Sequence, residues 1–142
     1  MAAEFGGERF VDAIYAAVFA PAVDQVMATL QEPPGRERHP RLVELHRWFA
    51  SRGAHDRLML RAALRECADS AVFGLLAVLD GARPISDGFQ HEPRLLITDG
   101  DHETQIAPEG DDGDLHGIFR SLVDERTAPT IVPLNTPDAH AP

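Results

Sequence analysis

The side chains with the greatest capacity for binding are carboxylates in the second half of the chain. Between residues 99 and 114 the sequence has seven acidic residues and no arginine: Asp99, Asp101, Glu103, Glu109, Asp111, Asp112 and Asp114. Carboxylates at this density attract the arginines and lysines of a basic protein and help to orient it. We therefore interpret this segment as a candidate partner-binding surface. Turn formation and helix capping explain the same residue types without a partner.

A metal site is the alternative use of these groups. The alternating oxygen donors of residues 99–103 suit calcium, but an EF-hand loop counted from Asp99 needs glycine and glutamate where the sequence has Thr104 and Gly110. His102 and His116 are the histidines that could serve zinc, which needs three or four converging ligands. No HExxH or paired-cysteine spacing occurs. The sequence therefore predicts no metal and no cofactor.

A row of arginines forms the second candidate site. Arg57, Arg61 and Arg65, followed by Asp69, recur at intervals of four and so share one stripe of a helix. Such a stripe either binds an anion or forms ion pairs within the protein. We favour ion pairs, with Arg65 bound to Asp69.

Covalent catalysis has little support in the sequence. The single cysteine, Cys67, is expected on the core face of its helix with Leu60 and Leu64, where burial disfavours a reactive thiolate. No serine lies in a GxSxG elbow, and no glycine-rich phosphate loop is present. The sequence favours a protein that is not an enzyme. One cysteine cannot form an internal disulfide, which suits a reducing cytoplasm.

Charge is divided unevenly along the chain. All 13 basic residues are arginine, and 23 acidic residues bring the formal net charge to −10. Residues 36–65 hold eight arginines and three acids, whereas residues 72–142 hold four arginines and 13 acids. Phosphate would be repelled by the acidic half, so the chain is not expected to bind nucleic acid. The longest wholly apolar run is too short to cross a bilayer, so no membrane partner is expected.

The binding groups need a scaffold, and residues 55–80 are expected to provide it as one long central helix. This stretch has no proline and is rich in Leu, Ala and Arg. From Ala71 to Leu79 it has no polar side chain, so we expect that part to be covered on all sides at the centre of the core. Asp80-Gly81 ends the helix.

Shorter elements surround the central helix. Residues 8–30 have helical spacing interrupted by Pro21, which predicts either a kink or two helices. A helix beginning at Pro40 should turn its apolar residues inward, among them Leu45 and Trp48.

The second half of the chain is expected to begin with a β-hairpin. It covers residues 94–107, with a loop of about four residues, Asp-Gly-Asp-His. A helix at 114–126 should be capped by Asp111 or Asp112. The prediction is a mainly α (α+β) domain at 1–126, a helical bundle around the central helix, followed by a Pro-rich extended or disordered tail at 127–142.

Two segments carry a resemblance. DSAVFGLLAVLDG (69–81) and DLHGIFRSLVDE (114–125) resemble segments of small uncharacterised bacterial cytosolic proteins, some of them immunity proteins or accessory factors. The resemblance implies a helical fold with a small β element and no known catalysis.

These observations together favour an acidic protein-interaction module. We expect an immunity or antitoxin-like inhibitor that covers the surface of a basic partner, for example a toxin, through residues 99–114. A small metal-dependent enzyme using His102 and His116 is the alternative. A structural homodimer, formed through the hairpin edge or the N-terminal helices, is a third reading.

Overall fold

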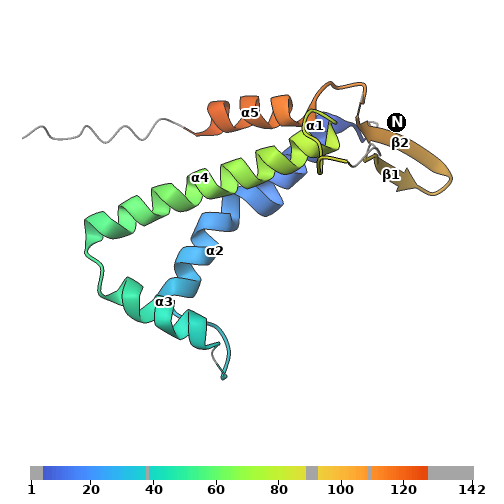
Figure 1. Ribbon diagram of the computed structural model, residues 1–142. Helices are drawn as coiled ribbons and strands as arrows, with labels where there is room; N and C mark the ends of the chain where they lie inside the picture. Colours follow the sequence, from blue (N-terminus) through green and yellow to red (C-terminus); the bar gives the residue numbers. More distant parts are fainter. Residues whose placement is uncertain (1–4, 38, 89–92, 109, 128–142) are drawn as a thin grey trace, which may run out of the picture.

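A computed structural model describes residues 5–37, 39–88, 93–108 and 110–127 of the chain (Figure 1). The elements in order are α1 (Gly7–Ile14), the π-helical turn η1 (Tyr15–Phe19), α2 (Ala20–Gln31), α3 (Pro40–Ala50), α4 (Ala54–Leu79), β1 (Leu95–Asp99), β2 (His102–Ala107) and α5 (Leu115–Arg126). This is the mainly helical α+β fold that the sequence predicts, with a two-stranded antiparallel hairpin.

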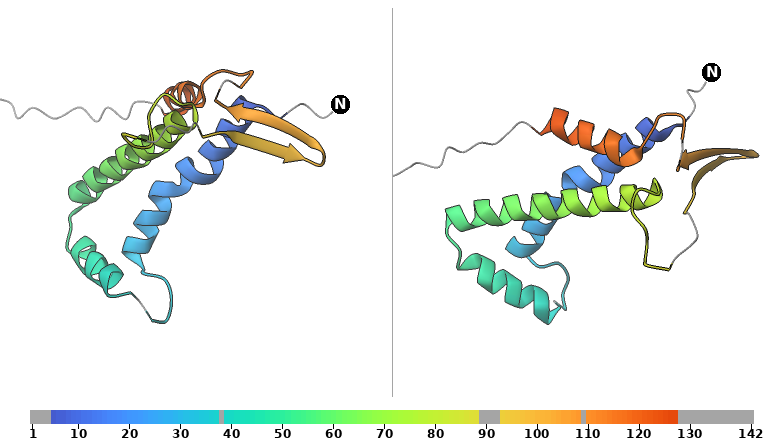
Figure 2. Two further views of the ribbon diagram at one scale, coloured as in Figure 1. Left: turned by 45° about the vertical axis from the view of Figure 1, so that its right-hand side comes forward. Right: turned by 45° about the horizontal axis from the view of Figure 1, so that its top comes forward.

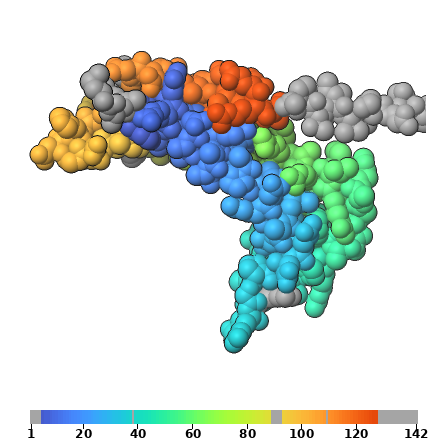
Figure 3. All heavy atoms as spheres, turned by 180° about the vertical axis from the view of Figure 1, so that it is seen from behind, coloured from blue at the N-terminus to red at the C-terminus, as the bar shows by residue number. Residues whose placement is uncertain are grey.

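The molecule is bent into two arms that α4 joins. In both views of Figure 2, α1, α5 and the hairpin gather at one end of α4, and α3 lies at the other end. Figure 3 shows the bend from behind, with α2 and α3 forming the descending arm. The main core lies in the first arm and contains Val11, Tyr15, Phe19, Leu76, Ile106, Ala107, Leu115, Phe119 and Val123. The second arm is thinner, with Val23, Leu30 and Phe49 buried.

The central helix forms as predicted, but one face of it is uncovered. Its 26 residues span about 39 Å. Leu76 and Ala77 are buried, whereas Ala71 is exposed and Leu75 is 61% exposed. Cys67 is exposed as well, so its predicted place on the core face is wrong. The cause is tertiary: η1, α2 and α5 pack on α4 and leave the side of Ala71 and Leu75 uncovered.

The predicted pairing of Arg65 with Asp69 within α4 is wrong. Asp69 instead pairs with Arg120 of α5, with 2.9 Å between Oδ2 and Nη1. The Arg65 guanidinium lies over the Phe19 ring at 4.2 Å and donates to the Thr127 hydroxyl. Packing of α5 against α4 decides this choice, because it brings a second arginine to Asp69.

The other arginines of the row also serve contacts between elements. Arg61 forms an ion pair with Asp24 of α2. Arg57 lies 4.7 Å above the Phe49 ring of α3 and donates to the Ala50 carbonyl. Arginine suits these places because its planar guanidinium can stack on an aromatic ring and donate hydrogen bonds at the same time.

Pro21 is accommodated by a π-helical turn. The helix runs on from Gly7 to Gln31, and η1 lies directly before Pro21, near the start of α2. A proline within a helix lacks the N–H that would bond to the preceding turn, and its ring crowds that turn. The wider π turn buries Tyr15 and Phe19 next to this proline.

The hairpin closes with a two-residue turn, which is shorter than expected. Asp99 pairs with His102, and Gly100 between them has a φ of +60°, which favours glycine. The register shifts between Leu95 and Leu96, leaving Ile106 unopposed. This bulge turns two successive residues, Ile106 and Ala107, into the core.

A carboxylate at the end of α4 caps the start of α5. Asp80 accepts hydrogen bonds from the backbone N–H groups of Leu115 (3.0 Å) and His116 (2.9 Å). The His116 Nδ1 lies 2.5 Å from the same carboxylate, whose side chain is 3% exposed. Asp80 therefore takes the role expected of Asp111 or Asp112.

Asp80→Ala is expected to lower the free energy of unfolding by about 2 kcal/mol, because covered donors of α5 lose their acceptor. Urea unfolding followed by circular dichroism measures this. Asp114→Ala is the matched control: Asp114 is the N-cap residue of α5, but its side chain makes no capping hydrogen bond. Asp114→Ala should lower the free energy of unfolding by about 0.5 kcal/mol or less. Equal losses in the two variants would contradict the role of Asp80.

Candidate functional site

The predicted acidic surface is divided between two places. Asp99, Asp101 and Glu103 lie at the hairpin turn, which we call the acidic tip, and all three are exposed. Asp111, Asp112 and Asp114 belong to the loop that leads into α5. The six residues of β2, about 20 Å of strand, separate the two groups. Glu109 lies outside the described residues.

The acidic tip projects from the body of the molecule (Figures 1 and 2). Asp99 is paired with His102, and Glu103 with Thr98. Because residues directly opposite share a face and successive residues alternate, carboxylates point to both faces of the hairpin. The tip can therefore meet positive charges from either side.

The hairpin also offers a strand edge. Within the described part of the chain, β1 has β2 as its one neighbour, so its other edge carries unpaired backbone groups. Leu96 on this strand is 43% exposed, between the half-buried Leu95 and Ile97. An exposed edge of this kind accepts an extended segment as an added strand.

The second acidic group includes a structural residue. Asp112 accepts a hydrogen bond of 3.1 Å from the backbone N–H of Glu8, in the first turn of α1. Gly6 and Gly7 allow this approach: a Cβ on Gly6 would overlap the Asp112 carboxylate, and one on Gly7 would lie 3.2 Å from a methyl group of Leu115. Asp112 thus caps α1, although it is exposed like Asp111 and Asp114.

The two candidate metal ligands are not brought together. His116 lies at the start of α5, bound to Asp80 and edge-on to Phe73 at 5.4 Å between ring centres. His102 is exposed at the hairpin turn, at the far end of β2 from α5. Among the residues that the structure describes, no three His, Cys, Asp or Glu side chains converge on a metal position.

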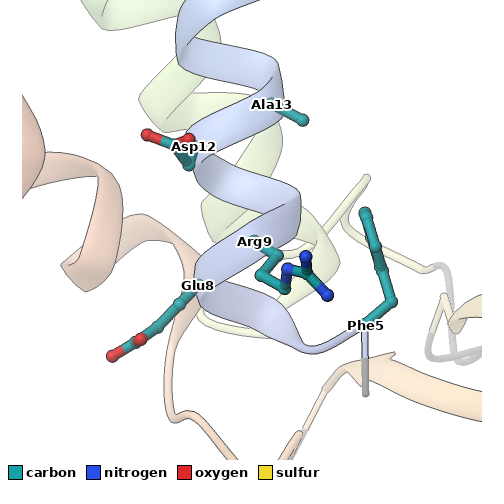
Figure 4. A pocket seen from close by; sticks show the side chains of 5 residues that line it. All are labelled: Phe5, Glu8, Arg9, Asp12 and Ala13. Carbon is teal, nitrogen blue, oxygen red and sulfur yellow. The ribbon is translucent and has the colours of Figure 1, made fainter. Parts of the chain in front are cut away.

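The surface depressions are shallow and open. One of about 430 Å³ lies beside the first turns of α1, and Figure 4 shows Glu8 and Asp12 pointing away from Phe5 and Arg9 around the helix. Another of about 460 Å³ lies at residues 28–35. In neither of these two depressions does a nucleophile meet a base.

Several large apolar side chains that a core would use are exposed. Leu45 and Trp48 of α3, expected inward, are 37% and 44% exposed, and that part of the prediction is wrong. Phe49 is the residue of α3 that is buried, since α3 packs on α2 and no described element covers its other side. On α4, Leu58 and Met59 are 63% and 58% exposed. The sequence contains a signal for these surfaces: its helices have more apolar faces than the neighbouring elements can cover.

One described helix, Gly7–Gln31, is long and apolar enough to cross a membrane by length and composition. A helix that packs into a protein core meets the same criteria, and Val11, Tyr15 and Phe19 of this helix lie in the main core.

Comparison of the chain with protein-family models, with curated proteins and with solved structures found no match.

Gly6→Ala is expected to lower the free energy of unfolding by about 1–2 kcal/mol, because the new methyl group displaces the Asp112 carboxylate from α1. Gly88→Ala, which has open space around it, is the neutral control. Asp112→Ala alone should cost about 1 kcal/mol. The double variant Gly6→Ala with Asp112→Ala should lose clearly less free energy of unfolding than the sum of the two single losses. The reason is that the new methyl group has no carboxylate to overlap once Asp112 is removed. Strictly additive losses in urea unfolding would contradict this contact.

Proposed function

We propose that this protein is an acidic protein-interaction module that binds a basic protein partner through the acidic tip and the adjoining edge of β1. Binding of this kind inhibits by covering the partner's surface, as an immunity or antitoxin-like protein does. The observation that carries the proposal is the projecting hairpin, whose exposed carboxylates take part in none of the described ion pairs.

Electrostatics supports a basic partner. Three acids elsewhere in the first arm have internal roles: Asp12 pairs with Arg126, Asp69 with Arg120, and Asp80 caps α5. The tip lies in the acidic half of a chain with a net charge of −10. It therefore presents a negative potential that would repel nucleic acid and steer an arginine- or lysine-rich surface toward the hairpin.

The strand edge can align a partner segment, which charge alone does not do. Backbone hydrogen bonds to β1 would align an extended partner segment, and the exposed Leu96 offers an apolar contact on one face of the added strand. Charges at the tip would then favour basic residues at the end of that segment near Asp99. A cytoplasmic location belongs to the same proposal, since the lone Cys67 is an unpaired thiol.

The test is capture of partners from a lysate of the native host on immobilised protein. Reversal of Asp99, Asp101 and Glu103 to arginine should reduce recovery of a basic partner at least tenfold, because repulsion replaces attraction at the contact. Salt of roughly 1 M, which shortens the screening length to about 3 Å, should release the partner from the wild-type protein.

The control carries the same change of charge elsewhere. Reversal of the exposed Glu44, Asp124 and Glu125 to arginine also replaces three acids by three bases, so both variants move the formal net charge from −10 to −4. Recovery should stay near the wild-type level in this control. Equal losses in both variants would show that overall charge, and not the tip, governs binding.

A further inference from the structure

The open edge of β1 presents a regular row of backbone and side-chain groups. A two-residue turn places a hydrogen-bonded pair directly beside it, here Asp99 and His102, and the direction of backbone hydrogen bonds alternates along a strand. Thr98 and Leu96 therefore direct their N–H and C=O groups away from β2. Both side chains are exposed, as is that of Arg94 directly before β1. This row is available for pairing with another strand.

β1 of a second copy meets the conditions that this edge sets for an occupant. It is extended, it offers an apolar side chain for Leu96, and a basic residue precedes it. If two β1 strands pair antiparallel with Leu96 beside the partner's Leu96, then Arg94 lies beside the partner's Thr98. The backbone groups of all these residues face outward, so each pair can exchange two hydrogen bonds. The two leucines form an apolar cross-strand pair at the centre.

Charge favours this antiparallel register. Arg94 is the one basic residue between positions 84 and 119, and it takes part in none of the ion pairs found among the described residues. Glu103 pairs with Thr98 across the hairpin, so the partner's Glu103 lies on the same face as Arg94, one strand beyond the partner's Thr98. Two strand spacings, roughly 10 Å, separate the two residues, and their long side chains can meet over the short threonine. The two-fold axis repeats this contact at the other end.

The parallel direction is unfavourable for charge and for space. Parallel strands would set Arg94 beside the partner's Arg94 and Asp99 beside the partner's Asp99, and like charges directly opposite are destabilising. The hairpin projects from the body (Figures 1 and 2). Antiparallel hairpins therefore carry the two bodies to opposite ends of the new sheet, whereas parallel hairpins bring both bodies to the same end.

We propose that a second copy of this chain covers the β1 edge and competes there with the basic partner. Two hairpins then form one four-stranded antiparallel sheet with Leu96 at its two-fold axis. Three or more strands are more stable than an isolated hairpin, and the pairing removes an exposed edge from each copy. The dimer rests on the strand edge alone, whereas the competition rests on the proposed function. A basic segment must displace the second copy before it adds to β1.

Cysteine substitutions on one face of β1 test the register in a Cys67→Ser background, which removes the native exposed thiol. In Leu96→Cys the two thiols meet at the axis, where the Cα atoms of a hydrogen-bonded pair are about 5.5 Å apart, within the range of a disulfide. In the matched control Thr98→Cys they are offset by four residues, roughly 13 Å along the strands. Mild oxidation should link Leu96→Cys at least tenfold faster than Thr98→Cys. Equal rates would mean random collision and would overturn the proposal.

Light scattering of the reduced wild-type protein tests the dimer without a covalent bond. Small edge interfaces associate reversibly, so the mass should rise from 15.5 kDa toward twice this value between roughly 10 μM and 1 mM. Arg94→Glu should raise the Kd at least tenfold, because it meets the partner's Glu103, and Arg94→Glu with Glu103→Arg should return the Kd to within about threefold of the wild type. Circular dichroism should show both variants folded, since both positions are exposed. A monomeric wild type, or a double variant without rescue, would contradict the dimer.

The disulfide-linked dimer separates the competition from the proposed function. Immobilised Leu96→Cys with Cys67→Ser should capture the basic partner from the native lysate when reduced. It should capture at least tenfold less when linked, because the second copy then occupies the edge. Equal capture in the two states would overturn the competition. A linked dimer combined with no capture of a basic protein in either state would refute the proposed function and the competition, while the cross-linking supports the dimer.

Discussion

The Asp80 carboxylate is the contact on which the arrangement of the first arm depends. It stands at the end of α4 and accepts hydrogen bonds from the start of α5 and from the His116 ring. The first N–H groups of a helix have no partner within the helix, and a buried helix end must find acceptors elsewhere. One nearly buried side chain meets this need and sets the place of α5 against α4. Phe119 and Val123 of α5 then reach the main core.

A second cap of the same kind closes the first arm. Asp112, in the loop before α5, accepts from the first turn of α1, and Gly6 and Gly7 leave room for it. Each cap comes from another segment of the chain, so the ends of α1 and α5 are both held by tertiary contacts. Ion pairs between Asp69 and Arg120 and between Asp12 and Arg126 join the same helices along their length. These partly exposed pairs add less than the covered cap made by Asp80, because solvent screens them.

The proposed function follows from what this arm leaves unpaired. The carboxylates of the acidic tip take part in none of the ion pairs found among the described residues, and the β1 edge has no neighbour there. The charged groups that join α1, α4 and α5 are used inside the arm, whereas those of the hairpin turn face solvent. This difference is why the proposal places the partner at the hairpin.

The sequence by itself determined the elements. Uninterrupted helix formers predicted the long helix at 55–80, observed at Ala54–Leu79, and the Asp-Gly-Asp-His turn predicted a hairpin within residues 94–107. These signals are local, so propensity and turn chemistry are enough to read them.

The tertiary structure alone decided which side chains meet. Nothing in the spacing of Arg65 and Asp69 showed that Arg120 would arrive from α5, or that Asp80 rather than Asp111 would cap that helix. Cys67 could be placed in the core or in water only once the neighbours of α4 were known, because periodicity shows which residues share a face but not which face is covered. For the same reason the residues at 99–114 were identified from sequence as one acidic segment, and the fold divided them between an exposed tip and a loop that contains a helix cap.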